Sequence, residues 1–418
     1  MRCLVCGNPL ELDVAIIGDQ YPSAIFLEHV TEKEFGLRKS SLNLSRCLNT
    51  SCSLVQLTEP VNLEMVYMHY PYQSGTTATM RSILSSVVDE SLSYQSLQTG
   101  EVILDIGGND GTLLSLINRP DCRLINIDAA SHIEQEYQIS NYTYINTRFE
   151  REAYLTLDIP APKLIFCVAV FYQVIDPLKF LQDVVAIMNN ESLLVLQMTY
   201  LESMYTNNIF DNVVHEHITY FSLASFTYVA ELAGLKVLGA RVVESYGGSL
   251  RVFLVTTTSS KIIQSLKSTV QNIVALESEK GIERTETLAK FGADFRNWKA
   301  TLGELLDSQF KRFGPIIGMG ASTKGNMILQ SLDITEKIMP FILDNNLKKI
   351  GSRTTGSFIP IVDEEKTRLT YTNVMSLPYY YDAFFKKKLS SKIESGRYLD
   401  FISPLPKPCV TRLFGDRE

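Results

Sequence analysis

The fold of this 418-residue chain is decided by the stretch Val102-Ile-Leu-Asp-Ile-Gly-Gly-Asn-Asp-Gly-Thr112. Its apolar run ends in a glycine-rich turn, and the apolar residues of 113–117 follow at helical spacing. Glycine lets the backbone turn sharply and approach a ligand closely, and a helix N-terminus offers free N–H groups. The stretch therefore predicts a buried strand, a ligand-binding turn and a helix.

The nature of the ligand is indicated by Asp128, which ends the next apolar run. A carboxylate at this position can accept hydrogen bonds from both hydroxyls of a ribose. Gly107, Gly108 and Gly111 do not have the spacing of the G-x-G-x-x-G phosphate fingerprint. This favours S-adenosylmethionine, a nucleoside without phosphate; the alternative is a structural turn that binds nothing.

Further apolar runs extend the predicted sheet on the C-terminal side of the turn. Runs at 163–169 and 192–197 are separated by helix-length segments, and a hairpin of 235–243 with 249–256 follows. Strands that alternate with helices form a parallel sheet covered on both faces, so the chain is predicted to be an α/β protein.

The remaining sequence predicts a second α/β unit and a division into domains. Residues 259–312 have apolar residues at helical spacing, which predicts two connecting helices, and the runs at 315–320 and 338–344 again resemble strands. We expect a small N-terminal domain at 1–70, a nucleoside-binding domain at 71–258, and connecting helices with a smaller α/β domain at 259–418.

Composition and charge exclude several classes of protein. A hydrophobic fraction of 45% and a charged fraction of 20% are typical of a packed globular protein. The net charge of −7, with only 39 lysines and arginines, argues against a nucleic-acid partner. The apolar runs are shorter than the roughly 20 residues that cross a bilayer, and a cysteine pair opens the chain where a signal peptide would begin. We expect a cytoplasmic protein with a small-molecule substrate.

Four of the seven cysteines lie within the first 52 residues, as the pairs Cys3-x2-Cys6 and Cys47-x4-Cys52. Two close pairs of thiolates can complete a tetrahedral Zn²⁺ shell, which leaves no open position for catalysis. In a reducing compartment this clustering indicates a structural metal site better than disulfides do. The alternative is four unrelated buried thiols.

Two further motifs carry chemistry. His215-Glu216-His217 places imidazoles beside a carboxylate, which can supply a general base near neutral pH; the alternative is a polar turn. The run Gly318-Met-Gly-Ala-Ser-Thr-Lys-Gly-Asn326 supplies glycines, hydroxyls and an ammonium at a predicted helix start, which are phosphate-binding groups. The alternative there is a tight strand-to-helix turn with an exposed lysine.

Together these motifs resemble the three-domain, zinc-containing sugar C-methyltransferases, which methylate C3 of a 4-keto-deoxy nucleotide sugar. The resemblance covers nearly the whole chain. It is carried by the cysteine quartet, the Tyr70-to-Gly75 segment, the Asp105-to-Gly111 turn, Val214-His-Glu-His217 with Tyr220-Phe-Ser222, Gly247-Gly-Ser-Leu-Arg251, and Gly320-to-Asn326. It implies a zinc-binding N-terminal domain, a Rossmann-like class I methyltransferase domain, and a C-terminal domain that helps to hold the nucleotide diphosphate.

The resemblance also implies roles for individual residues. His217 is the implied base, with an unperturbed pKa of about 6.5, Glu216 would orient or polarise it, and Tyr72 would contact the substrate or the enolate oxygen. The expected cofactor site comprises Asp105, Gly107, Asn109, Asp110, Gly111, Asp128 and Phe149. The expected substrate-binding residues are Tyr70, Gln173, His215, Tyr220, Ser249, Arg251, Ser322, Lys324 and Asn326.

The chain departs from the family pattern at three positions. Val214 stands where the family has a tyrosine, Gln173 where it has a histidine, and Gln197 where it has a glutamate. Val214 cannot donate a hydrogen bond to an enolate, and Gln173 cannot exchange a proton. Two alternatives to carbon methylation therefore stay open. One is methylation of oxygen or nitrogen with the same fold and cofactor, and the other is an assembly protein without activity.

Overall fold

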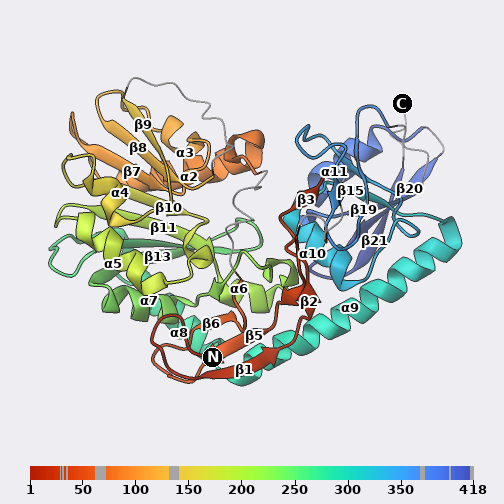
Figure 1. Ribbon diagram of the computed structural model, residues 1–418, viewed down its shortest axis with the longest axis horizontal. Helices are drawn as coiled ribbons and strands as arrows, with labels where there is room; N and C mark the ends of the chain where they lie inside the picture. Colours follow the sequence, from red (N-terminus) through yellow and green to blue (C-terminus); the bar gives the residue numbers. More distant parts are fainter. Residues whose placement is uncertain are drawn as a thin grey trace.

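The protein consists of two α/β lobes joined by a long helix and an N-terminal segment (Figure 1). The computed structural model describes residues 1–28, 30, 33, 36–61, 72–130, 141–367, 372–394 and 397–414. Tyr70 lies outside the described residues. No helix in these ranges is long and apolar enough to cross a membrane.

The first lobe is built on a seven-stranded sheet of order β13-β14-β11-β10-β7-β8-β9. Its strands are β7 (Val102–Ile106), β8 (Arg123–Asp128), β9 (Tyr142–Asn146), β10 (Leu164–Val168), β11 (Leu193–Thr199), β13 (Leu235–Val243) and β14 (Ser249–Thr256). Strands β7 to β11 are parallel, and the β13–β14 hairpin is added antiparallel at one edge. The predicted strands and hairpin are confirmed, and the arrangement is Rossmann-like.

Helices cover both faces of this sheet, which explains why its central strands are apolar throughout. One face packs against α2 (Ala78–Tyr94) and α3 (Thr112–Ser115). The other packs against α4 (Arg151–Leu155), α5 (Pro177–Ile187) and α7 (Leu223–Leu232). Strands β7 and β11 are buried at every residue.

The second lobe repeats this plan on a smaller sheet of order β18-β16-β15-β19-β20-β21. Its strands are β15 (Ile317–Met319), β16 (Ile342–Asp344), β18 (Ile361–Asp363), β19 (Asn373–Ser376), β20 (Tyr398–Ser403) and β21 (Cys409–Phe414), with helices α10 (Thr323–Ser331) and α11 (Asp382–Ser390). In both sheets, successive strands are added first on one side of the first strand and then on its other side. The strand order therefore switches between β7 and β10 and between β15 and β19. Ligands of open α/β sheets bind at such a switch point.

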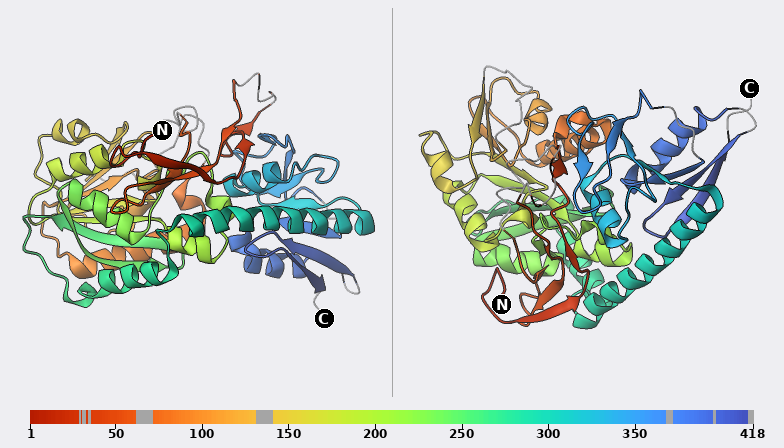
Figure 2. Two further views of the ribbon diagram at one scale, coloured as in Figure 1. Left: turned by 90° about the horizontal axis from the view of Figure 1, so that it is seen from below. Right: turned by 45° about the vertical axis from the view of Figure 1, so that its right-hand side comes forward.

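The two predicted connecting helices are α8 (Thr269–Lys280) and α9 (Thr285–Phe313). Glu277 of α8 is buried, and its carboxylate accepts hydrogen bonds from the backbone N–H groups of Leu223 and Ala224, which begin α7. Helix α9 contacts β1 (Leu10–Ala15) and then runs along the outside of the second lobe (Figure 2). It carries seven buried residues that include Trp298, so it forms part of the core beneath the second sheet.

The N-terminal segment pairs with both lobes. Strands β1, β5 (Leu44–Cys47) and β6 (Val55–Leu57) form a sheet that is completed by β12 (Thr219–Tyr220) of the first lobe. The short strand β3 (Phe26–Leu27) pairs with β17 (Arg353–Thr354) of the second lobe. The segment therefore links the two lobes through backbone hydrogen bonds.

Candidate active site

The glycine turn after β7 has the backbone geometry that its sequence predicts. Gly107 and Gly111 have φ angles of 70° and 80°, in the region that side chains disfavour. A Cβ atom on Gly107 would lie 2.4 Å from Val170 Cγ2. The turn therefore brings bare backbone to the carboxyl end of the sheet.

Two carboxylates line this turn. The oxygens of Asp128 accept hydrogen bonds from the backbone N–H groups of Asn109 at 2.9 Å and Ala130 at 2.7 Å. Asp105 is buried, and its Oδ2 has no hydrogen-bond partner among the described residues. Burial and the charges of Asp128 and Asp110 raise the pKa of Asp105 well above its ordinary value. An unpaired buried oxygen and a bare backbone turn fit a polar nucleoside such as S-adenosylmethionine.

Asn109 and Asp110 of the turn hold residues 72–75, which belong to the Tyr70-to-Gly75 segment, beside the predicted cofactor site. Asn109 accepts a hydrogen bond from Ser74 N at 3.0 Å and donates one to the carbonyl oxygen of Tyr72 at 3.2 Å. Asp110 is buried and accepts from Gly75 N at 2.8 Å. Tyr72 is thereby held beside the turn. Phe149 packs edge-on against Phe180, with ring centroids 5.5 Å apart.

Asp128→Ala is expected to weaken binding of S-adenosylhomocysteine by about 1.5–3 kcal/mol, the range for hydrogen bonds that involve a charged group. The substitution removes the carboxylate that is predicted to accept from the ribose hydroxyls, together with its hydrogen bond from Asn109 N. Isothermal calorimetry measures the loss. Asp121→Ala is the control, because Asp121 is exposed and pairs with Arg119. Equal affinities for the two variants would remove Asp128 from the cofactor site.

His217 lies in a loop between η3 (Phe210–Asn212) and β12, and its ring is oriented by the backbone. Its Nδ1 donates a hydrogen bond to the carbonyl oxygen of Asn212 at 2.8 Å, which leaves the Nε2 lone pair free to accept a proton. Burial, aided by the charge of Lys324, lowers the pKa of His217 to about 3. The expected unperturbed pKa is therefore wrong, although the imidazole is neutral at pH 7 as expected.

The two neighbours of His217 have different surroundings. Glu216 is 3% exposed, and burial raises its pKa to about 7. His215 is buried, and its Nε2 lies 3.2 Å from the carbonyl oxygen of Ser40 in the N-terminal segment. Since Asn212 supplies the hydrogen bond that orients His217, the structure does not give this role to Glu216, in contrast to the expectation from the sequence.

The second lobe contributes a cation and tyrosines to this loop. Lys324, at the start of α10, donates hydrogen bonds to Asn212 Oδ1 and to the hydroxyl of Tyr380 at 3.3 Å. The Tyr380 hydroxyl donates in turn to buried Asp211, at 3.3 Å. Because Tyr380 follows β19, the switch point of the second sheet faces the His217 loop.

The other predicted substrate residues lie in several places. Gln173 Nε2 donates to the carbonyl oxygen of Ala169, and Tyr220 hydroxyl donates to that of Asn212. Ser249 donates to the carbonyl oxygen of Ser245, while Ser322 caps α10 by accepting from Gly325 N. The amide of Asn326 donates hydrogen bonds to the carbonyl oxygen of Ser23 and to the hydroxyl of Thr355. Arg251 is buried, and its guanidinium donates to Gln197, Ser86 and Glu90.

Four residues of this cluster are not part of any motif described above, namely Asp211, Asn212, Tyr246 and Tyr380. The ring of Tyr246 lies 5.7 Å from Lys324 Nζ. A usable signal was the run of three tyrosines at 379–381, which follows a short apolar stretch as expected for the carboxyl end of a strand. Nothing in the sequence indicated the contact between Asn212 and Lys324.

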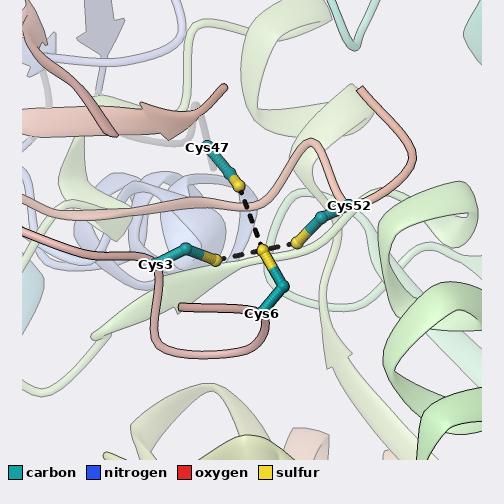
Figure 3. A group of neighbouring side chains, drawn as sticks. All are labelled: Cys3, Cys6, Cys47 and Cys52. Carbon is teal, nitrogen blue, oxygen red and sulfur yellow. Dashed lines mark hydrogen bonds between the residues drawn. The ribbon is translucent and has the colours of Figure 1, made fainter. Parts of the chain in front are cut away.

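The four N-terminal cysteines converge as predicted, and they can hold a metal ion (Figure 3). Their sulfur atoms all lie within 4.8 Å of one another, with Cys3–Cys52 at 3.7 Å and Cys6–Cys47 at 3.4 Å. Ligands about 2.3 Å from a tetrahedral ion are separated by roughly 3.8 Å, close to these distances. No disulfide links the seven cysteines. Cys3, Cys47 and Cys52 are buried in the same core as Phe221.

Comparison with known proteins identifies both lobes. Residues 78–239 match the methyltransferase domain family, and residues 244–406 match the C-methyltransferase C-terminal domain family. The chain therefore combines a methyltransferase domain with a C-terminal domain of the kind found in C-methyltransferases. The C-methyltransferase NovU of Streptomyces niveus is 25% identical over 414 residues, which are 98% of this chain and 96% of that protein. These matches indicate a methyltransferase that depends on S-adenosylmethionine.

Solved methyltransferases resemble part of this chain. The plantazolicin methyltransferase BpumL in complex with S-adenosylhomocysteine is 15% identical, with a TM-score of 0.35, and the match covers 43% of this chain and 85% of that one. The mitomycin 7-O-methyltransferase MmcR is 14% identical, with a TM-score of 0.33, and the match covers 42% of this chain and 54% of that one.

Proposed function

We propose that this methyltransferase adds a methyl group to C3 of a nucleotide-linked deoxysugar, next to a ketone at C4. The observation that carries the proposal is His217, whose Nδ1–H is held by the carbonyl oxygen of Asn212 while Nε2 is left to accept a proton. A ketone acidifies the hydrogen on the adjacent carbon, so a neutral base that is held in one orientation suits carbon methylation.

In this mechanism His217 removes the proton from C3, and the resulting enolate carbon receives the methyl group. S-adenosylmethionine, held by the 107–111 turn and Asp128, would supply an electrophilic methyl group on its sulfonium. Tyr72, fixed by Asn109, would contact the sugar. Tyr172 packs against the His217 ring with centroids 4.4 Å apart, which restricts the imidazole to one orientation. Residues of the second lobe would bind the nucleotide.

We further propose that the ion held by the four cysteines is Zn²⁺ and that its role is structural. Four sulfur ligands at tetrahedral spacing suit Zn²⁺ and leave no position for a substrate. Clustered cysteines that hold a metal ion without forming disulfides support a reducing compartment such as the cytoplasm. We place the domain boundaries near residues 70 and 258.

Exchange of solvent deuterium tests the proposed reaction. In D₂O without methyl donor, the wild-type enzyme is expected to label C3 of a thymidine diphosphate or uridine diphosphate 4-keto-deoxy sugar. With S-adenosylmethionine, the product is expected to carry the new methyl group on carbon, as measured by NMR and mass spectrometry. A product methylated on oxygen or nitrogen, or absence of exchange with both nucleotides, would contradict the proposal.

A further inference from the structure

Lys324 reaches from the second lobe into the loop that holds the proposed base. Its Nζ donates hydrogen bonds to Asn212 Oδ1 and, at 3.3 Å, to the hydroxyl of Tyr380. Asn212 belongs to the first lobe, and its carbonyl oxygen accepts the hydrogen bond from His217 Nδ1 at 2.8 Å. A single residue thus contacts both the cation and the imidazole.

The surroundings of Lys324 leave one of its hydrogen-bond donors free. An ammonium group has three N–H donors, and two are used by Asn212 and Tyr380. The third has no acceptor among the residues that the structure describes. The ring of Tyr380 lies 4.7 Å from Nζ, and the charge of Asp211 opposes the lowering of the Lys324 pKa by burial. The result is a partly dehydrated cation with one unused hydrogen bond beside His217.

We propose that Lys324 is a catalytic residue that donates this hydrogen bond to the ketone oxygen of the substrate as it becomes an enolate oxygen. The inference rests on the carbon methylation proposed above and names the group that stabilises its intermediate. His217 Nε2 takes the proton from C3, the C–H electron pair forms the C3=C4 double bond, and the carbonyl π pair moves to the oxygen. The enolate carbon then bonds to the methyl group as the sulfur–methyl bond breaks, and the carbonyl returns.

Electrostatics favour this role for Lys324. A cation near an imidazole makes the imidazole a weaker base, and Lys324 lowers the pKa of His217 in this way. When an enolate oxygen forms beside Lys324, its negative charge offsets the repulsion between the ammonium and the new imidazolium. A fixed donor aimed at developing charge in a partly dehydrated site stabilises the transition state more than the ground state.

The sequence motif suggests that Lys324 binds the diphosphate of the substrate, and the contacts favour the ketone instead. The diphosphate is attached through C1, whereas the ketone oxygen is on the carbon bonded to C3. Because Lys324 contacts Asn212, the residue that orients the proposed base, we place the ketone, which is next to the reacting carbon, at its free donor. Val214, which stands in place of the family's tyrosine, offers no hydrogen bond to that oxygen.

Lys324→Met tests the proposal, with Lys349→Met as the matched control. Lys349 is another partly buried lysine that contacts the 318–326 run. It donates to the carbonyl oxygen of Ala321, and its Nζ lies 5.0 Å from the centre of the Phe26 ring. In the full-length enzyme, Lys324→Met is expected to slow both C3 deuterium exchange and kcat by about 10²–10³-fold, the range for loss of one oxyanion donor. KM and S-adenosylhomocysteine affinity are expected to stay unchanged, and Lys349→Met is expected to keep wild-type exchange.

The outcomes separate this proposal from the proposed function. Normal exchange in Lys324→Met, or a raised KM with unchanged kcat, would overturn the role of Lys324 and leave carbon methylation intact. No exchange by the wild-type enzyme would overturn both. If Lys324→Met loses S-adenosylhomocysteine binding, the Lys324→Ala variant with added ethylammonium is the second test. Faster deuterium exchange with ethylammonium than with ethanol supports the proposal, and equal exchange rates overturn it.

Discussion

Replacing His217 with asparagine is expected to lower kcat by about 10²–10⁴-fold, the usual contribution of a general base. Asparagine can still donate a hydrogen bond to the carbonyl oxygen of Asn212, but it has no basic nitrogen to replace Nε2. Exchange of deuterium at C3 should fall together with kcat, because both need the same proton transfer. The affinity for S-adenosylhomocysteine, measured by calorimetry, should not change.

His215→Asn serves as the comparison for this variant. The two histidines are separated by one residue, but His215 hydrogen bonds to Ser40 in the N-terminal segment. Its replacement should lower the free energy of unfolding and have a smaller effect on exchange. An equal loss of exchange in both variants would mean that the loop is disrupted, and full exchange in His217→Asn would exclude His217 as the base.

Loss of a metal ligand is expected to have the largest effect on stability. Cys47→Ser should abolish stoichiometric metal binding and lower the free energy of unfolding by more than about 4 kcal/mol, since binding of structural zinc is itself folding free energy. Strand β5, which ends at Cys47, and strand β6 carry buried residues at every position, so their unfolding exposes apolar surface. Metal analysis and thermal unfolding measure the two effects.

Cys409→Ser is the control for this substitution, because Cys409 is an exposed free cysteine. It should keep both the metal content and the unfolding temperature of the wild-type protein. Protein purified without chelator that contains no zinc, or a Cys47→Ser variant as stable as Cys409→Ser, would rule out a structural zinc site. Strand β12 pairs with β6 directly after His217, so activity should decline as the N-terminal sheet unfolds.

The features that the sequence predicted are those encoded by neighbouring residues. Strand β7, the glycine turn after it and the β13–β14 hairpin each have a continuous apolar run and a turn signal, and they were found with nearly the same bounds. Cys3 and Cys6 could be paired with Cys47 and Cys52 because two close pairs of cysteines are typical of a tetrahedral metal site.

The features that could not be predicted depend on contacts between distant residues. Strand β12 has only two residues, too few to show a periodicity, and it belongs to a sheet formed mainly by residues 10–57. The bond from Lys324 to Asn212 spans 112 positions of sequence. The pKa of His217 is set by burial and by Lys324, so it follows from the packing of the two lobes and from no local motif.

The N-terminal segment limits how these enzymes can be recombined. Gln20 and Tyr21 hydrogen bond to Ser331 and Gln330 of α10, while β6 pairs with β12 beside the His217 loop. A chimera that exchanged only the C-terminal lobe for that of a relative would break the first set of contacts. A chimera made to alter substrate choice should therefore exchange the C-terminal lobe together with residues 19–27. In the sequence, the whole methyltransferase lobe lies between these two parts.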